Sequence, residues 1–352
     1  MPQSSPVLSS RPRRLRSALT VLVAATAVVG LLAGCSAAAD RPKSGSGAGN
    51  SEVATGGAKF STADEETAKL GTEAKPGVFP RTITHADGST KLAKKPKRVV
   101  VLDTGELDEV IALGIIPVGI PTTDGASPTP AYLAKKVKGV ATVGNIQELN
   151  LEAIAALKPD LILGSQLRAD KLYPQLSAIA PTVFSIRPGF PWKENFLLAG
   201  AALGEETKAE GILNAYTAKA EKLRADITGD PTISLLRFLP GKTRLYGNKS
   251  FIGVIMTDVG LPRPQIQDID ELAVEISPEN VQQADADRIF YSSYGTPEAT
   301  AEQQVLDGPV WPTLAAVKAK HAQPVDDGTW FLGLGPLGAD RVLDELRELL
   351  VT

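Results

Sequence analysis

A repeat within the chain places the strongest limit on its fold. Residues 150–163 and residues 277–290 superpose without a gap. In both copies an N-cap residue, Asn150 or Ser277, opens a short helix with a glutamate in its first turn, and an aspartate then precedes an apolar strand. Because each copy is a helix followed by a strand, we expect one copy in each of two similar α/β lobes.

Residues 79–188 have the pattern of the first α/β lobe. Continuous apolar runs such as Arg98-Val-Val-Val-Leu102 are typical of buried parallel strands, and the segments between them have helical spacing. The pattern predicts a hairpin over 81–90 that turns at Asp87-Gly88, strands over 98–102, 116–120, 160–163 and 182–186, and helices over 106–113, 152–157 and 172–179.

Residues 189–228 are predicted to be helical and to join the lobes. A helix over 193–203 is followed by a longer one over 205–227, whose apolar side chains recur at three- and four-residue steps. At 1.5 Å per residue the longer helix would span about 35 Å. The second lobe, residues 229–352, is predicted to contain strands over 233–238, 243–246 and 288–292 and helices over 251–259, 278–284 and 337–350.

Residues 1–34 have the features of an export signal. Four arginines between positions 11 and 16 precede an apolar run over 18–33 that is too short to span a bilayer. The sequence Leu-Ala-Gly-Cys that ends at Cys35 resembles the bacterial lipobox, whose cysteine becomes the lipidated first residue of the mature chain. Cys35 is the only cysteine, and the alternative is a stray or buried thiol. The pair Arg13-Arg14 leaves a twin-arginine export route open.

Residues 35–78 are predicted to be a flexible tether. From residue 36 onward they consist mostly of Gly, Ala, Ser, Thr and charged residues, which bury too little apolar surface to offset the entropy of ordering. A flexible chain of this length would hold the folded part roughly 35 Å from a lipid anchor. We therefore expect the protein on the extracytoplasmic face of the cell membrane, anchored through Cys35.

Charge and histidine content exclude several kinds of function. The chain beyond residue 34 has a net charge of −7, and its one basic run is 94–98, which argues against a nucleic-acid partner. His85 and His321 are the only histidines, so a metal site built from several histidines cannot be assembled. We expect no resident cofactor, and any metal cargo must arrive already chelated. The GxSxG and GxxxxGK[ST] motifs are absent.

Several features together resemble the iron-siderophore substrate-binding lipoproteins of ABC importers, a family that includes the ferric-hydroxamate and cobalamin binding proteins. The features are the lipobox, the tether, the stretch from Lys97 to Gly119, the Leu-Glu to Pro-Asp-Leu-Ile segment over 151–162 and the single long helix between the lobes. The match covers about residues 79–352. The resemblance implies two α/β lobes bridged by one rigid helix, with the ligand in the cleft between them, and we expect a monomer.

The resemblance also implies contacts with an ABC permease. In the family a glutamate on each lobe docks onto arginines of the permease, and the matching positions here are Glu152 and Glu279. The alternative is purely structural, because a carboxylate in the first turn of a helix is favoured by the helix dipole without any function.

A ferric siderophore presents negatively polarised oxygens on a bulky apolar body, so its site should combine arginines with aromatic walls. Arg168 follows a first-lobe strand, and strand ends open into the cleft. Arg237 ends a second-lobe strand and matches a position where hydroxamate-binding relatives carry a ligand arginine. Each could instead be a surface arginine in a salt bridge. Arg187 is a third candidate.

Aromatic residues make up only 5% of the chain, so those near the expected cleft loops stand out. Trp192, Tyr246 and Tyr294 are candidates for the walls, with core or rim packing as the alternative. Trp330 is expected to pack in the core. The segment 143–146 lacks an arginine that some relatives carry there, and Arg168 is the candidate to replace it.

The expected function is to capture a ferric siderophore and deliver it to an ABC importer. Two or three arginines in an acidic protein suit a neutral or cationic hydroxamate better than a highly negative tricatecholate. Cobalamin or haem is the alternative cargo for the same fold. A rival from another class is an anchored hydrolase that uses Asp103 and Glu106, or Asp268 and Asp270, as acid and base, although such carboxylate pairs are common in acidic proteins.

Overall fold

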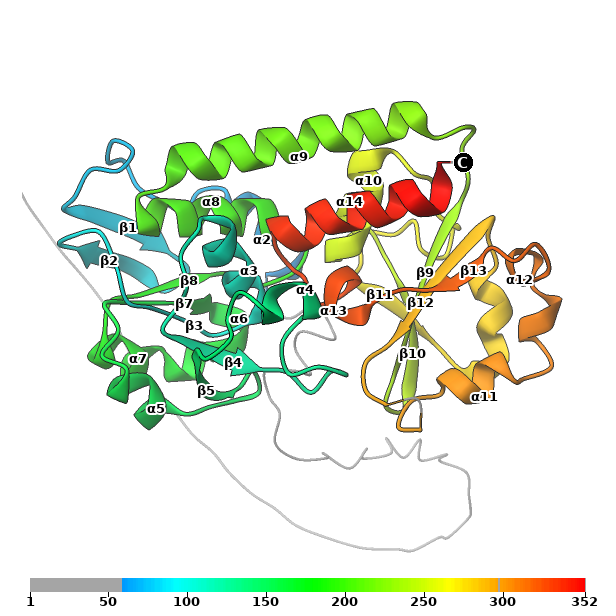
Figure 1. Ribbon diagram of the computed structural model, residues 1–352, viewed down its shortest axis with the longest axis horizontal. Helices are drawn as coiled ribbons and strands as arrows, with labels where there is room; N and C mark the ends of the chain where they lie inside the picture. The colour runs from blue at the N-terminus through cyan, green and yellow to red at the C-terminus, as the bar shows by residue number, and fades with distance from the viewer. Residues whose placement is uncertain (1–58, 297, 352) are drawn as a thin grey trace, which may run out of the picture. The chain divides into compact units, whose positions relative to one another are not determined.

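The computed structural model describes residues 59–296 and 298–351. Two α/β lobes lie beneath the long helix α9 (Glu206–Asp226), which extends across both of them (Figure 1). This is the two-lobed α/β architecture predicted from the sequence, and α9 is one residue shorter at each end than predicted. The predicted signal, Cys35 and residues 36–58 of the predicted tether lie outside the described residues.

The first lobe contains a six-stranded sheet. Its strands lie in the order β6-β5-β4-β3-β7-β8 and are parallel, except that β6 runs antiparallel to β5. The strands are β3 (Val99–Val101), β4 (Gly119–Thr122), β5 (Ala141–Asn145), β6 (Glu148–Leu149), β7 (Leu161–Ser165) and β8 (Thr182–Ser185). The helices are α3 (Thr104–Ala112), α4 (Ala131–Ala134), α5 (Leu151–Ala156), α6 (Gln166–Ala169), η2 (Asp170–Leu172) and α7 (Tyr173–Ile179).

Two local features of this lobe differ slightly from the sequence prediction. The hairpin of β1 (Arg81–His85) and β2 (Gly88–Leu92) turns one residue earlier than predicted. The strand predicted over 116–120 begins only at Gly119, because Pro117 has no N–H to donate to a sheet and Ile116 points to solvent with 61% of its surface exposed.

The second lobe contains a five-stranded sheet in the order β11-β10-β9-β12-β13. Strands β9, β12 and β13 are parallel to one another, whereas β10 runs antiparallel to β9 and to β11. The strands are β9 (Ile233–Leu239), β10 (Lys242–Tyr246), β11 (Ala273–Ile276), β12 (Arg288–Ser293) and β13 (Ala322–Pro324). The helices are α10 (Phe251–Val259), η3 (Pro278–Ala284), α11 (Glu302–Leu306), η4 (Trp311–Thr313), α12 (Ala315–Lys318), α13 (Asp327–Trp330) and α14 (Pro336–Leu350).

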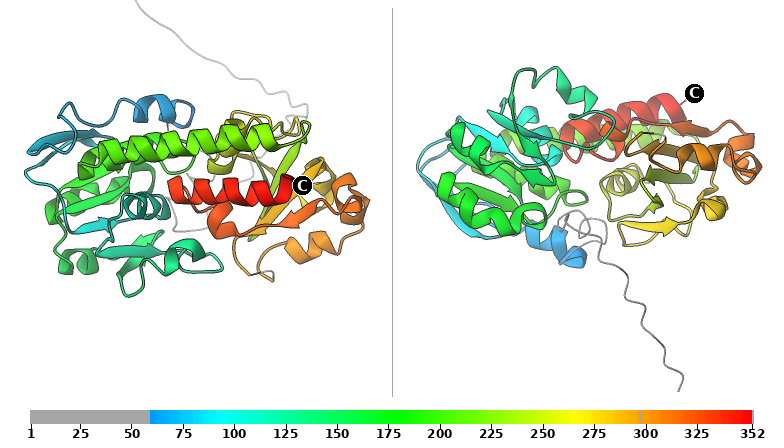
Figure 2. Two further views of the ribbon diagram at one scale, coloured as in Figure 1. Left: turned by 45° about the horizontal axis from the view of Figure 1, so that its top comes forward. Right: turned by 90° about the horizontal axis from the view of Figure 1, so that it is seen from below.

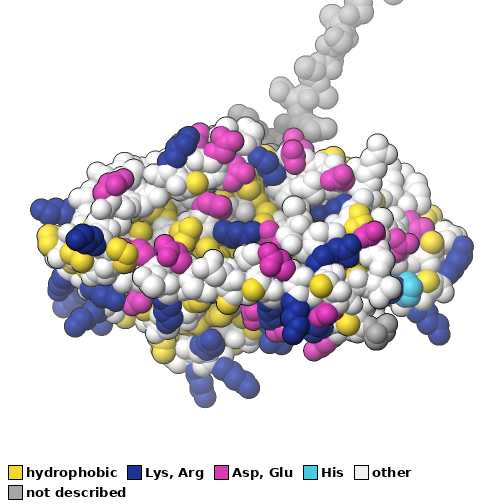
Figure 3. Space-filling model, turned by 90° about the horizontal axis from the view of Figure 1, so that it is seen from above, with side chains coloured by type: hydrophobic (Ala, Val, Ile, Leu, Met, Phe, Trp, Pro, Cys, Tyr) yellow, Lys and Arg dark blue, Asp and Glu magenta, His cyan; other side chains and the backbone are white. Residues whose placement is uncertain are grey.

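Helices α8 (Trp192–Leu203), α9 and α14 connect the lobes. The turn between α8 and α9 is made by Gly204, whose φ of 65° is easily adopted by glycine. Helix α9 buries only its inner stripe, and the face of the molecule above it carries both basic and acidic side chains (Figure 3). Helix α14 begins at the first lobe, where the Asp108 carboxylate accepts hydrogen bonds from the N–H groups of Leu337 and Gly338, both 2.8 Å.

The repeat has a structural explanation, since its aspartate fixes the start of a neighbouring strand in each lobe. In the first lobe, the Asp160 carboxylate accepts hydrogen bonds from the N–H groups of Lys97 (3.0 Å) and Arg98 (2.7 Å), just before β3. In the second lobe, Asp287 Oδ2 accepts from the N–H and the hydroxyl of Thr232, both 2.8 Å, just before β9. These bonds set the register of the parallel pairs β3-β7 and β9-β12.

The helices of the two copies are less alike than their sequences. The Asn150 side chain caps α5 by accepting from the N–H of Ala153 at 2.9 Å, as predicted. Ser277 occupies the N-cap position before Pro278, as predicted, but its hydroxyl makes no capping hydrogen bond and accepts from the Asn280 side chain at 3.1 Å instead. The segment that follows is a 3₁₀ helix with a kink at Asn280 rather than an α-helix.

Residues 59–78 pack against the lobes, so the prediction that the flexible tether continues to residue 78 is wrong. The short helices η1 (Phe60–Thr62) and α2 (Ala63–Thr67) bury Ala63 and Thr67 completely or nearly so. Gly71 then forms a bridge with Thr84 of β1. A few apolar side chains in this mostly polar stretch are enough to hold it to the folded part.

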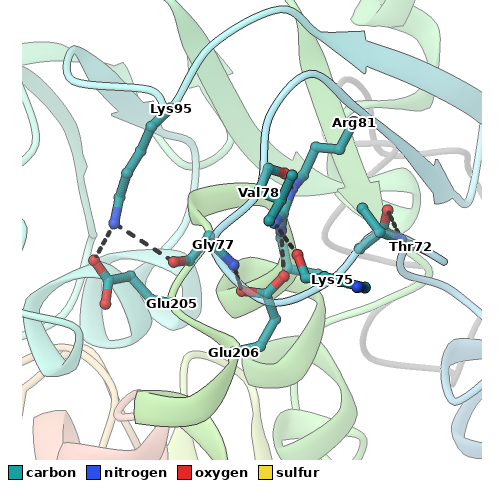
Figure 4. Close-up of polar contacts among 11 residues, drawn as sticks. Thr72, Lys75, Gly77, Val78, Arg81, Lys95, Glu205 and Glu206 are labelled. Carbon is teal, nitrogen blue, oxygen red and sulfur yellow. Dashed lines mark hydrogen bonds and ion pairs between the residues drawn. The ribbon is translucent and has the colours of Figure 1, made fainter.

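The end of this segment is fixed to the start of α9 (Figure 4). The buried guanidinium of Arg81 forms an ion pair with Glu206 and donates to the carbonyls of Lys75 (3.0 Å) and Val78 (2.8 Å). Glu206 Oε2 also accepts from the N–H of Gly77 at 3.1 Å. These contacts attach the chain before the first lobe to the helix that joins the lobes.

Candidate functional site

A cavity of about 750 Å³ lies between the two lobes. Residues of the first lobe that line it include Asp124, Gly125, Ile146, Gln147, Arg168 and Arg187. Residues of the second lobe that line it include Arg237, Lys242, Arg244, Tyr246, Tyr294 and Phe331. The cleft implied by the resemblance is thus present; its walls are formed by loops of the first lobe and by strands β9 and β10 and neighbouring loops of the second.

The lining is rich in positive charge. The lining residues include five cationic side chains, Arg168, Arg187, Arg237, Lys242 and Arg244. The one carboxylate among the lining residues is that of Asp124. The sequence analysis identified the first three and missed Lys242 and Arg244. Both could have been found, because side chains two residues apart on a strand point to the same face, and Tyr246 of the same strand was already a candidate.

Arg237 lines the cavity and forms a salt bridge, but this salt bridge is buried, so Arg237 is not the surface arginine of the alternative. Its Nε and Nη2 donate to the two carboxylate oxygens of Asp327 at 2.6 Å each, and its Nη1 donates to the Tyr246 hydroxyl at 3.1 Å. Its guanidinium also lies over the rings of Tyr294 (4.9 Å) and Phe331 (5.2 Å). Burial alone would lower the pKa of Arg237, but Asp327 and Tyr246 raise it above its ordinary value. Arg237 therefore stays charged and organises the aromatic wall.

Arg168 is also held by a carboxylate. Its Nε donates to Asp103 Oδ2 at 2.7 Å, and both side chains are almost fully buried. Asp103 precedes α3 and its other oxygen accepts from the N–H of Thr104 at 2.7 Å, which orients the carboxylate toward Arg168. Arg168 thus presents a fixed, partly compensated charge at the first-lobe wall.

Arg187 lies near Arg168 and packs against aromatic rings. Its guanidinium carbon is 4.6 Å from the ring centroid of Phe60 and 5.1 Å from that of Phe190. Burial, followed by repulsion from the charge of Arg168, lowers the pKa of Arg187 to about 10. Arg187 therefore remains charged at neutral pH.

Lys242 and Arg244 share one carboxylate at the second-lobe wall. Arg244 donates through Nε (3.0 Å) and Nη2 (2.8 Å) to Glu275 Oε1, and Lys242 Nζ lies 3.1 Å from the same oxygen. Burial would raise the pKa of Glu275, but hydrogen bonds from Arg244 and Lys242 lower it. The single negative charge of Glu275 is therefore shared by the positive charges of Lys242 and Arg244.

Of the predicted aromatic walls, Tyr246 and Tyr294 line the cavity and Trp192 does not. Trp192 is fully buried at the start of α8, where its ring packs against Tyr216 (5.0 Å) and Phe251 (6.0 Å) in the core. Phe251, which packs against Trp192, lines the cavity in its place. Phe331, which the sequence analysis did not propose, packs on Tyr246 at 4.9 Å.

Trp330 lies in the core, as expected. Its ring is fully buried against Phe290 at 5.1 Å, and its Nε1 donates to Glu345 at 2.5 Å.

The carboxylate pairs of the hydrolase alternative lie outside the cavity lining. Asp103 is engaged with Arg168, and Glu106 is buried with Oε2 unpartnered among the described residues. Burial, and then the Asp103 carboxylate, raise the pKa of Glu106 to about 8. Asp268 accepts a hydrogen bond from the Asn248 side chain at 2.9 Å. Within the described part of the chain, no three His, Cys, Asp or Glu side chains are grouped to hold a metal.

Glu152 and Glu279 are both exposed, each in the first turn of its helix, α5 in one lobe and η3 in the other. Hydrogen bonds from its own N–H and from the Ser277 hydroxyl lower the pKa of Glu279. Both carboxylates are therefore accessible from outside the cleft.

Known proteins share this sequence and this fold. The family model described as periplasmic binding protein matches residues 99–323. The probable siderophore-binding lipoprotein YfiY of Bacillus subtilis (strain 168) is 36% identical over 282 residues, which cover 76% of this chain and 86% of the relative. The achromobactin-binding periplasmic protein of Dickeya dadantii (strain 3937) is 30% identical over 264 residues, which cover 72% of this chain and 86% of the relative.

Among solved structures, Staphylococcus aureus SirA complexed with staphyloferrin B is 32% identical and has a TM-score of 0.69, over 76% of this chain and 97% of that chain. The extent of the family match, the level of identity to the relatives and the shared two-lobed fold agree with the resemblance seen in the sequence. This chain belongs to the periplasmic binding protein family.

Proposed function

We propose that this protein is the lipid-anchored, extracytoplasmic binding component of an ABC importer and that it captures a ferric siderophore between its lobes. The observation that carries the proposal is the interlobe cavity of about 750 Å³, which combines five cationic side chains with aromatic walls. A ligand of this kind needs cations for its chelating oxygens and apolar surface for its body. The names of YfiY and of the SirA complex support the same class of ligand.

The charge balance of the site favours a chelate of low net charge. Carboxylates partly neutralise the cations of the lining. The ion pairs are Asp103 with Arg168, Asp327 with Arg237, and Glu275 with both Lys242 and Arg244. We therefore propose a hydroxamate chelate first. A carboxylate chelate such as ferric staphyloferrin B is the second candidate, because Lys242 and Arg244 outnumber their one carboxylate partner at the second-lobe wall. Cobalamin and haem are further alternatives for the same cavity.

Arg168, Arg237, Tyr246 and Tyr294 are the proposed ligand contacts, joined by Arg187 and Arg244. Iron would enter with its chelator, so we propose no resident cofactor. Binding rather than catalysis fits the site, because the buried carboxylates near it are engaged with arginines or lie outside the lining.

Glu152 and Glu279 are proposed to dock onto the permease, one from each lobe, because both are exposed and the resemblance assigns this role to their positions. Cys35 is proposed as the lipidated residue. Among the described residues, no helix combines the length and the apolar character needed to cross a bilayer.

A fluorescence titration tests the proposal. Trp192 contacts Phe251 of the cavity wall, and Trp330 is followed directly by Phe331, so tryptophan emission should respond to an occupied cavity. We expect quenching by ferrioxamine and not by its iron-free chelator, with ferric staphyloferrin B, a ferric tricatecholate, cobalamin and haem as the comparison set. Quenching by haem or cobalamin alone would overturn the siderophore proposal.

A further inference from the structure

The segment before the first lobe lies against both lobes beside the cavity. We call residues 60–67, which form η1 and α2, the clasp (Figure 2, right, blue). On the side of the first lobe, the ring of Phe60 meets the ring of Phe190 edge to face at 5.4 Å. On the side of the second lobe, Lys249 Nζ donates to the Ser61 carbonyl at 2.8 Å. Because Phe60 also packs against Arg187 of the first lobe, the clasp contacts both lobes.

The residues that the clasp contacts are next to the cavity wall in each lobe. Phe60 lies under the guanidinium of Arg187, which lines the cavity and is only 2% exposed. Phe190 directly follows Gly189 of the lining, and Lys249 directly precedes Ser250 of the lining. A shift of the clasp would therefore move wall residues on both sides of the ligand.

The clasp is also part of a small core that spans the two lobes. Ala63 is fully buried in a cluster with Ile186, which directly precedes Arg187, and Phe190, which follows Gly189. Val254 of α10, in the second lobe, packs against the same cluster. Burial of these apolar groups favours one position of the clasp.

The contact between Phe60 and Arg187 has the geometry of a cation–π interaction. A guanidinium within about 6 Å of a ring centroid is attracted by the negative face of the ring, most strongly where water is excluded. The ring holds the guanidinium in place without neutralising its charge. Arg168, which carries a like charge nearby, would otherwise favour displacement of Arg187.

We propose that the clasp contributes to ligand binding by positioning residues of the cavity wall. Phe60 is a positioning residue that holds Arg187 against the cavity, and the bond from Lys249 to Ser61 connects the second lobe to the same segment. This proposal goes beyond the binding function, because it assigns a role in binding to the stretch that connects the folded part to its predicted anchor.

Two substitutions at one position test the positioning role. Phe60→Leu keeps an apolar side chain but removes the ring, whereas Phe60→Tyr keeps the ring, and its added hydroxyl has room because Phe60 is half-buried. Val78→Ala, at a half-exposed position outside the clasp, is the matched control. With ferrioxamine and ferric staphyloferrin B as probes, we expect Phe60→Leu to weaken binding about 2- to 30-fold and Phe60→Tyr and Val78→Ala to leave it unchanged.

A measurement without ligand keeps this test separate from the proposed function. Amide hydrogen exchange on the full ligand-free chain should become faster over 186–190 and 249–254 in Phe60→Leu but not in Phe60→Tyr. Lys249→Met should speed exchange over 60–67. Unchanged exchange in both Phe60→Leu and Lys249→Met would overturn the clasp, as would equal losses of affinity in Phe60→Leu and Phe60→Tyr. Failure of the wild-type protein to bind either chelate would count against the proposed function, and the exchange data would still decide the clasp.

Discussion

Arg237 and Asp327 form a buried two-point ion pair at the wall of the interlobe cavity, with both N–O distances at 2.6 Å. Ser292 donates a further hydrogen bond to Asp327 Oδ1 at 2.8 Å. The pair joins β9 to the start of α13, 90 residues later in the chain. Its geometry makes Arg237 a support of the second-lobe wall as well as a candidate ligand contact.

Removing one partner of this pair should destabilise the protein strongly. Asp327→Ala would leave the buried guanidinium uncompensated, which costs about 3–5 kcal/mol in the free energy of unfolding. Urea unfolding measures the change. Lys219→Ala, which removes the partly exposed ion pairs from α9 to Asp340 and Asp344 of α14, is the control and should change stability by less than about 1 kcal/mol. Equal losses in the free energy of unfolding for the two substitutions would show that the buried pair stabilises the protein no more than an exposed one.

The second-lobe cations should discriminate between chelates. Arg244→Met would remove a nearly buried guanidinium from the lining and should weaken binding of ferric staphyloferrin B by about 1.5–3 kcal/mol, the range for a hydrogen bond to a charged group. Binding of ferrioxamine, which has no carboxylate, should weaken less. Fluorescence titration of both chelates measures the difference, with the exposed Lys318→Met as control. A loss of the same size for both would indicate that Arg244 maintains the shape of the wall instead.

Stability should fall as pH rises from about 4.5 to about 8, because Glu106 has an ordinary pKa near 4.5 when unfolded and a pKa of about 8 when buried beside Asp103. The folded state therefore binds the proton more tightly, so the stability contributed by protonated Glu106 is complete below the lower value and lost through the higher one. The total loss in the free energy of unfolding is on the order of 1.4 kcal/mol for each unit by which the two pKa values differ.

Glu106→Gln should flatten this dependence, as measured by thermal unfolding at a series of pH values. Part of the slope should persist, because burial also raises the pKa values of Asp108 and Glu109 on the same helix. Glu348→Gln, at an exposed position of α14, is the control and should leave the profile unchanged. An identical profile in Glu106→Gln and the wild type would refute the assignment.

The exposed glutamates should separate binding from transport. Replacing Glu152 and Glu279 together by Gln should leave the affinity for the ferric chelate intact and abolish uptake of iron in cells, because both side chains lie outside the cavity lining. The matched control replaces Glu210 of α9 and Glu348 of α14, which are equally exposed on other elements. Normal uptake in the first variant would reject the docking role.

The buried elements of the fold could be predicted because their patterns are local. Strands such as β3, β7 and β9 are buried along nearly their whole length and appear in the sequence as mostly apolar runs, although β9 also contains Ser234 and Arg237. Strands β5, β6, β11 and β13 were not predicted. They are short and partly exposed, and polar residues or glycine interrupt their apolar residues.

The site was predictable only in part, because its electrostatics depend on distant contacts. Arg168 and Arg237 were found from their places at the ends of strands, but their partners Asp103 and Asp327 lie 65 and 90 residues away in the chain. No spacing rule connects such residues. Trp192 was misplaced for the same reason, since only the packing of α8 decides that its ring points into the core.

The connection between the lobes has a kinetic consequence. Helix α9 runs without a break from one lobe to the other, and α14 begins against the first lobe through Asp108. Because these two helices hold the lobes relative to each other, the cavity between the lobes should keep nearly the same shape when it is empty and when it is filled, so binding should require little further ordering of the protein. Different ligands should therefore associate at similar rates and differ chiefly in their dissociation rates.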